Sequence, residues 1–178
     1  ERDADAAAER ALGGVGLPLF VKPANQGSSV GIHKVTSPEG LLPALRDAAR
    51  YDVKVLCERA VDAREIEVAL LGIDPIEASA PGEIRSDREF YDYEAKYVDE
   101  DTELLVPAPL EPEQTARVRD LAVRAMVALE GAGLGRADFL LERSTGEFWV
   151  NEVNSLPGFT QESSMYPKLW EASGLSYP

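Results

Sequence analysis

The chain has 178 residues, of which 44% are hydrophobic and 28% are charged, and its formal net charge is −14. This length and balance favour a folded protein with one core or two small lobes, and they argue against disorder over the whole chain. The acidic excess disfavours nucleic acid and anionic membranes as partners, because both repel a negative surface. No apolar run of about 18 residues occurs, so no membrane span is predicted. The single cysteine, Cys57, excludes an internal disulfide and is consistent with a reducing cytoplasm.

The first 51 residues predict a helix, two strands and a second helix. Residues 1–12 favour a helix that ends at the glycine cluster GGVG. Residues 17–23 and 30–35 are typical of short strands on either side of a loop rich in glycine and serine. Residues 36–51 begin with a Ser-Pro pair that suits a helix start and continue with an apolar stripe, although Pro43 is unfavourable inside a helix.

The middle of the chain predicts strands followed by a long loop. Residues 53–60 and 64–72 are strand-like, and the second alternates apolar residues with two glutamates, which predicts one face open to water. Residues 76–84 predict a further strand that breaks at its Pro-Gly pair. Residues 85–103 are charged and tyrosine-rich without a clear period, and long loops in compact domains are often lids.

The last third predicts a helix and a hairpin. Residues 111–130 give the clearest helix of the chain, with a proline and a glutamate at its start and a buried apolar stripe. Residues 136–158 favour a hairpin that turns at the segment Ser-Thr-Gly. The whole pattern predicts an α+β fold with mostly antiparallel strands, because the regular βαβ alternation of a doubly wound sheet is missing.

The predicted hairpin brings four polar residues together. If the turn centres on Thr145, Asp138 faces Glu152 and Arg136 faces Asn154. Side chains alternate between the two faces of a strand, so all four side chains point to the same face. The apolar residues of the hairpin do not share one face cleanly, and we therefore expect a register slip at a glycine bulge beside the turn, near residue 146.

Two carboxylates and an amide oxygen are ligands that suit a hard cation such as magnesium. Magnesium keeps several positions for water and substrate phosphate, so few protein ligands are needed. The arginine of the same patch can bind a carboxylate or a developing oxyanion. On spacing alone, the other interpretation is a solvated face with salt bridges on an exposed sheet.

The glycine- and serine-rich loop lies within FVKPANQGSSVGIHKV, residues 20–35. Gly27 and Gly31 allow the backbone to turn its N–H groups toward an anion. Hydroxyl donors follow the first of these glycines, and Lys22 precedes the loop with a fixed charge. The order differs from a Walker P-loop, in which the lysine follows the glycines. A plain flexible hairpin loop is the alternative, but beside a magnesium patch the pattern indicates a nucleotide triphosphate.

A third segment, CERAVDAREIEVA, joins the two middle strands. Backbone groups at Ala60 and Val61 can bind an adenine edge, and Glu58 or Glu65 can accept from an amine or from ribose hydroxyls. An ordinary connection between strands is the alternative interpretation.

These segments together resemble the D-alanine–D-alanine ligases of the ATP-grasp superfamily. The likeness covers nearly the whole chain and rests on seven ordered motifs, FVKPANQGSSVGI, ERAVDAREIEVA, FYDYEAKY, VPAPL, GLGRADFLL, NEVNSLPGFT and SMYPKLWEASG. It implies a two-lobed ATP-grasp fold, with residues 1–60 in the small central lobe and residues 61–178 in a truncated large lobe. The family's N-terminal lobe and last helix are expected to fall outside this chain.

The resemblance implies an ATP site. It assigns Lys22 and Lys96 to the nucleotide phosphates, and Tyr97 to a bond with the serine of the closing loop. The remaining positions that it assigns to that loop, the adenine and the ribose are Ser28, Ser29, Val30, Gly31, Glu58, Ala60, Val61 and Glu65. Ser28 is also expected near the first D-alanine.

The resemblance also implies two magnesium ions, with manganese as an alternative, held by Asp138, Glu152 and Asn154. It implies that Arg136 stabilises the tetrahedral intermediate. The reaction would join two D-alanine molecules through an acyl phosphate, with ADP as product, for peptidoglycan precursor synthesis. The isolated chain is expected to bind Mg-ATP weakly and not to ligate.

For the acceptor, the resemblance assigns the carboxylate to Gly158 and a following serine, either Ser163 or Ser164, because the spacing of PGFTQESSMYP differs by one residue from the family's. The motif FYDYEAKY favours an amine acceptor over D-lactate, and a ligase that uses D-lactate or D-serine is the alternative. A nucleotide- or metal-binding module without activity is a further alternative. The expected partners are small-molecule substrates, with no nucleic acid or membrane, and a homodimer of the full-length protein.

Overall fold

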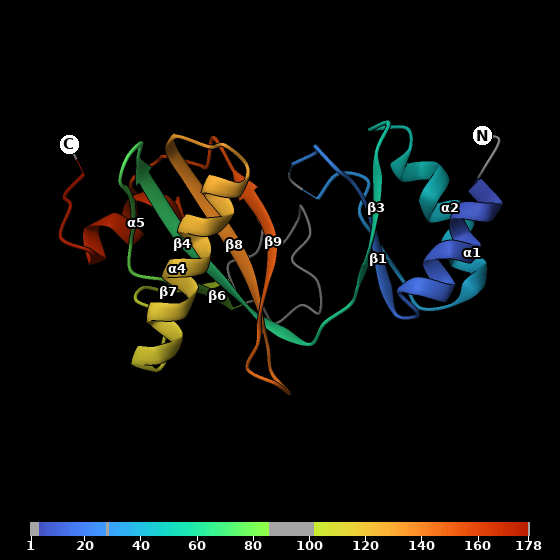
Figure 1. The fold of residues 1–178 in the computed structure, drawn as a ribbon, viewed down its shortest axis with the longest axis horizontal. Helices are drawn as coiled ribbons and strands as arrows, with labels where there is room; N and C mark the ends of the chain where they lie inside the picture. Colours follow the sequence, from blue (N-terminus) through green and yellow to red (C-terminus); the bar gives the residue numbers. More distant parts are fainter. Residues whose placement is uncertain (1–3, 28, 86–101, 178) are drawn as a thin grey trace. The chain divides into compact units, whose positions relative to one another are not determined.

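The computed structural model describes residues 4–27, 29–85 and 102–177. The described residues up to Val61 form one unit, and those from Asp62 onward form a second. Each unit has its own antiparallel sheet (Figure 1) and its own hydrophobic core. The α+β fold predicted from the sequence is therefore confirmed. Most of the predicted lid, residues 86–101, lies outside the described residues.

The first unit is a three-stranded sheet with two helices on one face (Figure 1). Its elements are α1 (Ala4–Gly14), β1 (Leu19–Pro23), β2 (His33–Val35), α2 (Pro38–Ala48) and β3 (Val55–Arg59). The strand order is β2-β1-β3, and every pair is antiparallel. Leu19 and Val21 face the helices and are fully buried, whereas Phe20 and Lys22 face the other way. The helix α2 continues through Pro43.

The second unit is a six-stranded sheet with one helix on each face. Its elements are β4 (Ala63–Gly72), β5 (Ile76–Ala78), β6 (Gly82–Arg85), β7 (Glu103–Leu105), α4 (Pro112–Ala128), β8 (Gly133–Glu142), β9 (Phe148–Asn154) and α5 (Met165–Ala172). The strand order is β7-β6-β4-β8-β9, and β5 also pairs with β4. The predicted break in residues 76–84 separates β5 from β6. No helix in the described ranges is both long and apolar enough to cross a membrane.

Both faces of β4 are covered, so the prediction that one face is open to water is wrong. Ile66, Val68 and Leu70 are fully buried in a core that includes residues of α4, which lies in front of β4 and β8 in Figure 1. On the opposite face, Ala69 is fully buried against α5, and Glu67 is only 5% exposed. The alternation of residue types along β4 could not reveal that its second face is buried. The helix that covers Ala69, α5, comes nearly a hundred residues later in the chain, and the buried Glu67 is stabilised by an ion pair with Arg136.

The hairpin of β8 and β9 contains a β-bulge, but not where we expected it. Asp138 pairs with Glu152 and Phe139 pairs with Val150, so Asn151 is the extra residue. The expected bulge near residue 146 is therefore wrong. Phe148 packs against the core before the bulge and Val153 packs against it afterwards, because the extra residue changes which side chains face inward.

Candidate active site

Five polar side chains meet on the face of the second sheet that carries Ala69. The predicted pairing is confirmed at this point, with Arg136 opposite Asn154 and Asp138 opposite Glu152. On the other side of β8, Glu67 of β4 lies opposite Asp138. Residues directly opposite one another in a sheet point to the same face, so three adjacent strands contribute to one cluster. We call Glu67, Arg136, Asp138, Glu152 and Asn154 the charged cluster.

Arg136 lies at the centre of this cluster. Its Nε and Nη2 each donate a hydrogen bond of 2.7 Å to one oxygen of Asp138, in a bidentate pair. The same Nε lies 3.2 Å from Oε2 of Glu67, so the guanidinium is placed between carboxylates of two different strands. The Nδ2 group of Asn154 donates to Oδ2 of Asp138 at 2.9 Å and to Oε1 of Glu152 at 3.3 Å.

The cluster is largely withdrawn from water. The side chains of Glu67, Asp138 and Arg136 are 7%, 13% and 18% exposed. Burial on its own would lower the pKa of Arg136, but its hydrogen bonds to Asp138 and the charges of Glu67, Asp138 and Glu152 raise it above its ordinary value. The guanidinium therefore stays charged at any physiological pH, and it balances only part of the negative charge around it.

The donor set of the charged cluster fits a hard divalent cation. Asp138 and Glu152 both accept from the amide nitrogen of Asn154, so oxygens of the two carboxylates converge on one point of the sheet. Carboxylate and amide oxygens are the ligands that magnesium prefers. A cation would compete there with Arg136 and Asn154 for the same oxygens. Among residues 4–27, 29–85 and 102–177, no group of three or more His, Cys, Asp or Glu residues forms a metal site, so the candidate set is limited to two carboxylates and one amide.

In the first unit, the structure pairs two of the candidate nucleotide-binding residues. Nζ of Lys22 on β1 lies 2.8 Å from Oε2 of Glu58 on β3. The antiparallel register places Lys22 opposite Leu56, so Glu58 is its diagonal neighbour on the sheet face away from the helices. The lysine side chain is 12% exposed and that of Glu58 is 40% exposed, which leaves the carboxylate accessible from water.

The glycine- and serine-rich loop is anchored at its base to the turn after α2. The backbone and side-chain nitrogens of Asn25 both donate to Oδ2 of Asp52 at 2.8 Å, and Nε2 of Gln26 donates to the carbonyl of Tyr51. Gly31 has a φ of +73°, and a Cβ added there would lie 2.5 Å from Cδ2 of Tyr51. Only glycine fits this position without displacing the ring, so the sequence places a glycine where the loop returns to the sheet.

Two of the predicted lid residues lie beyond this anchored base. Ser29 has a left-handed backbone, with φ of 59°, and Val30 is 39% exposed. The N–H of Val30 donates to the carbonyl of Gly27 at 3.3 Å. The predicted residues Ser28, Lys96 and Tyr97 lie outside the described residues.

The predicted adenine and ribose residues fall on both sides of the boundary between the units. Ala60 and Val61 close the first unit, and the N–H of Ala60 donates to the carbonyl of Pro18 at 3.1 Å. Glu65 belongs to the second unit, where it lies on β4 between Leu140 and Ile84 of the neighbouring strands.

The predicted acceptor residues are brought together at the start of α5. Oγ of Ser164 accepts from the N–H of Thr160 at 3.0 Å, and a Cβ added at Gly158 would lie 2.8 Å from that oxygen. Oγ of Ser163 lies 2.6 Å from Oγ1 of Thr160. Both serines are therefore tied to Thr160, but Ser164 is also packed against Gly158 and is the N-cap residue directly before α5.

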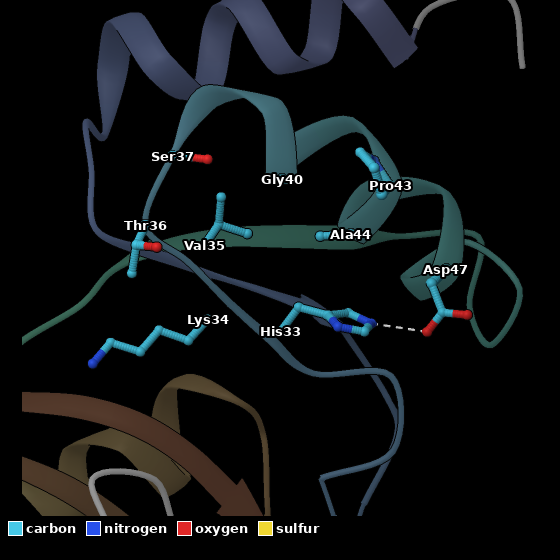
Figure 2. Close-up of a pocket in the computed structure, with 9 residues that line it drawn as sticks. All are labelled: His33, Lys34, Val35, Thr36, Ser37, Gly40, Pro43, Ala44 and Asp47. Atoms are coloured by element: carbon cyan, nitrogen blue, oxygen red, sulfur yellow. Dashed lines mark hydrogen bonds and ion pairs between the residues drawn. The ribbon is translucent and has the colours of Figure 1, made fainter.

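A hollow of about 360 Å³ lies elsewhere in the first unit, between β2 and one side of α2. Figure 2 shows His33 and Asp47 at one end, joined by a contact of 2.8 Å, with Ser37 and Gly40 at the other. The bond to His33 is the main cause that lowers the pKa of Asp47. None of the residues predicted to bind nucleotide lines this hollow, so we assign it no part in the candidate site.

Sequence reasoning missed Glu67 as a member of the cluster. The alternation in residues 64–72 placed it on the same face as Glu65, but the sequence did not show that β4 pairs with β8. The one signal was a glutamate surrounded by Ile66, Val68 and Ala69, because a lone carboxylate in an apolar strand needs a cationic partner.

The chain is similar to known proteins of one family. A family model described as "D-ala D-ala ligase C-terminus" matches residues 1–178. The D-alanine–D-alanine ligases of Heliobacterium modesticaldum and Thermoanaerobacter sp. are 53% and 57% identical over 92% of this chain, which covers 44% and 45% of their lengths. The chain thus spans about half the length of the curated relatives it matches.

Solved structures give the same result. The VanG D-Ala:D-Ser ligase of Enterococcus faecalis has a TM-score of 0.87 and 35% identity over 99% of this chain and 51% of its own. The D-alanine–D-alanine ligase of Coxiella burnetii has a TM-score of 0.80 and 32% identity over 97% of this chain and 44% of its own. The ATP-grasp fold expected from the sequence is therefore confirmed, and the chain belongs to the D-alanine–D-alanine ligase family, whose C-terminal part it matches.

Proposed function

We propose that the full-length gene product joins two D-alanine molecules to D-alanyl-D-alanine at the expense of ATP, through an acyl phosphate, for peptidoglycan synthesis. The observation that carries this proposal is the charged cluster, in which Asp138, Glu152, Asn154 and Arg136 share one sheet face in a chain of this family. ATP and magnesium, with manganese as an alternative ion, are the cofactors. The work of the protein is to hold charged groups in place, as in phosphoryl transfer generally.

The residues of the cluster divide this work. Asp138, Glu152 and Asn154 would hold magnesium, two ions in the full complex, and magnesium supplies charge neutralisation on the phosphates. Arg136 would stabilise the oxyanion that develops when the acceptor amine attacks. Its pair with Asp138 uses one N–H on each of two nitrogens, and a guanidinium carries five, so three remain for such a role.

In the first unit, Lys22 would bind the nucleotide phosphates. Its present partner is the accessible carboxylate of Glu58, which would accept from the nucleotide's hydroxyl or amine groups when ATP is bound. Ser28, Ser29, Val30 and Gly31 would form the loop that covers the phosphates, with Lys96 and Tyr97 completing the closed site. The anchored base at Asn25 and Gln26 supports a loop that moves only beyond that point.

At the acceptor end, Gly158 and Ser164 would hold the carboxylate of the second D-alanine. The packing of Ser164 against Gly158 favours it over Ser163, which contacts Thr160 alone among these residues. Residues 1–60 would be the small lobe of the ATP-grasp fold and residues 61–178 the large one. We also propose a cytoplasmic, homodimeric enzyme that has no nucleic acid or membrane partner.

The test is dipeptide synthesis by the full-length gene product from ATP, magnesium and D-alanine, followed by mass spectrometry. We expect dipeptide and ADP in equal amounts, and loss of both in the Asp138→Asn variant. Asp120→Asn is a matched control, because Asp120 is 67% exposed on α4. A gene product that releases no phosphate in response to D-alanine would contradict the proposal.

A second acceptor is worth testing, because one similar solved structure is a D-Ala:D-Ser ligase. A competition of D-alanine, D-serine and D-lactate at equal concentrations separates these activities by product mass. The curated relatives above 50% identity are D-alanine–D-alanine ligases, which favours D-alanine as the acceptor. The share of product made from D-lactate should be smallest at high pH, because the competing amine acceptors are then deprotonated and can attack. A preference for D-serine or D-lactate at neutral pH would replace the proposed acceptor while leaving the rest of the site intact.

A further inference from the structure

Glu67 is the one member of the charged cluster to which the family resemblance assigned no role. Its carboxylate comes from β4, opposite Asp138, and its Oε2 lies 3.2 Å from Nε of Arg136. The side chain is 7% exposed, so the carboxylate is held away from water beside a guanidinium that is itself 18% exposed. A buried carboxylate is costly unless a cation stays beside it, and here that cation is Arg136.

Arg136 is shared between two carboxylates with different surroundings. Asp138 also accepts a hydrogen bond from Asn154, whose amide nitrogen donates to Glu152 as well. The oxygens of Asp138 therefore belong to the candidate cation site. Glu67 lies on the opposite side of β8 from Glu152 and Asn154, which are on β9. A cation on Asp138 would withdraw electron density from its oxygens and repel the guanidinium, which weakens the bidentate pair. The ion pair with Glu67 is then the contact that continues to hold Arg136.

We propose that Glu67 is a positioning residue, which holds the Arg136 guanidinium in place from the neighbouring strand when Asp138 binds a cation. This inference rests on the proposed function, because it assigns the Asp138 oxygens to magnesium and Arg136 to the reacting oxyanion. Glu67 itself touches neither substrate nor metal. Its effect is to keep the guanidinium of Arg136 in its orientation toward the reacting oxyanion while Asp138 binds the cation.

The first test is the coupling of phosphate release to dipeptide formation in the full-length gene product. Glu67→Gln keeps the side chain's shape and removes its charge. We expect kcat for dipeptide to fall roughly 10- to 100-fold, the usual range for a residue that orients a directly acting group, with the KM for ATP little changed. Because an acyl phosphate that is not attacked by the amine is lost to water, the ratio of phosphate to dipeptide should rise above one.

Glu83→Gln is the matched control for burial. Glu83 lies in the same sheet, is 2% exposed, and accepts two hydrogen bonds from Arg64 at 2.8 and 2.7 Å. Arg64 pairs with Leu141 of β8, five positions along that strand from Arg136, so this ion pair is separate from the charged cluster. It should lose stability, yet keep one phosphate per dipeptide. Glu67→Asp, which retains the charge but withdraws it by one methylene, should recover part of the lost coupling, and it serves as the test if Glu67→Gln does not fold.

The second test observes the guanidinium directly, without turnover. Arginine labelled with ¹⁵N gives an Nε–H signal for Arg136, identified by its absence in Arg136→Lys. On addition of Mg-ADP, the signal should persist in the wild type and broaden in Glu67→Gln, while the two proteins behave alike without magnesium. If Glu67→Gln matches Glu83→Gln in coupling and keeps the signal with Mg-ADP, the inference is wrong. If the wild type neither forms dipeptide nor binds Mg-ADP, the proposed function fails instead.

Discussion

Replacement of Arg136 by methionine should destabilise the protein strongly, and magnesium should restore part of the loss. The variant removes the cation that lies between Glu67 and Asp138 and leaves two carboxylates that are 7% and 13% exposed. Removal of one partner of a buried ion pair costs about 3–5 kcal/mol in the free energy of unfolding. A cation bound to Asp138 and Glu152 offsets this by mass action, about 2.7 kcal/mol when magnesium is at a hundredfold excess over its dissociation constant.

Urea unfolding followed by circular dichroism, with and without magnesium, measures both effects. Arg124→Met is the control, because Arg124 lies 3.5 Å from Asp120 with both side chains about 70% exposed, and exposed pairs contribute about 0–1 kcal/mol. The reasoning would be refuted if Arg136→Met cost no more than Arg124→Met. If the loss were large but calcium, magnesium and sodium chloride at equal ionic strength all left it unchanged, the cluster would be a purely structural ion-pair network.

Three further predictions address other parts of the chain. Asn151 is the extra residue of the bulge, so its deletion should leave Glu152 opposite Asp138 in a regular ladder and Mg-ADP binding measured by calorimetry should be retained; loss of binding at unchanged helical content would contradict this. Gly31→Ala should cost about 1–2 kcal/mol, because its φ of +73° disfavours a side chain, and a urea midpoint equal to the wild type would be inconsistent with the loop geometry. Glu83 has a pKa below its ordinary 4.5, since the bonds from Arg64 outweigh the effect of burial, so its stabilisation is present above that value and lost as the pH falls through the folded pKa. Glu83→Gln should therefore flatten the loss of stability as the pH falls below about 4.5 in unfolding titrations.

The sequence was informative where periodicity and local chemistry decide the structure. The helix over residues 111–130 and the hairpin that follows were predictable, because an apolar stripe and a Ser-Thr-Gly turn are local signals. The pairing of Asp138 with Glu152 was also predicted correctly, although the reasoning contained two errors that cancel. The turn is centred half a residue earlier than assumed, since Leu141 pairs with Phe148, and the bulge at Asn151 restores the register at the site.

What could not be predicted depends on contacts between distant segments. The burial of Glu67 requires β4 to pair with β8, about seventy residues later in the chain. The burial of Ala69 likewise requires α5, which contributes Tyr166 and Trp170 to the opposite face of the sheet. The anchoring of the serine-rich loop on Tyr51 and Asp52 also joins segments about 25 residues apart. No property of a single strand or loop contains this information.

The most direct test of the account is a crystal structure of the full-length gene product with manganese and a non-hydrolysable ATP analogue, using the anomalous signal of manganese to locate the ions. The account predicts metal peaks within about 2.0–2.3 Å of carboxylate oxygens of both Asp138 and Glu152, with the γ-phosphate on the same ions. Manganese bound to the nucleotide phosphates without either carboxylate would contradict it.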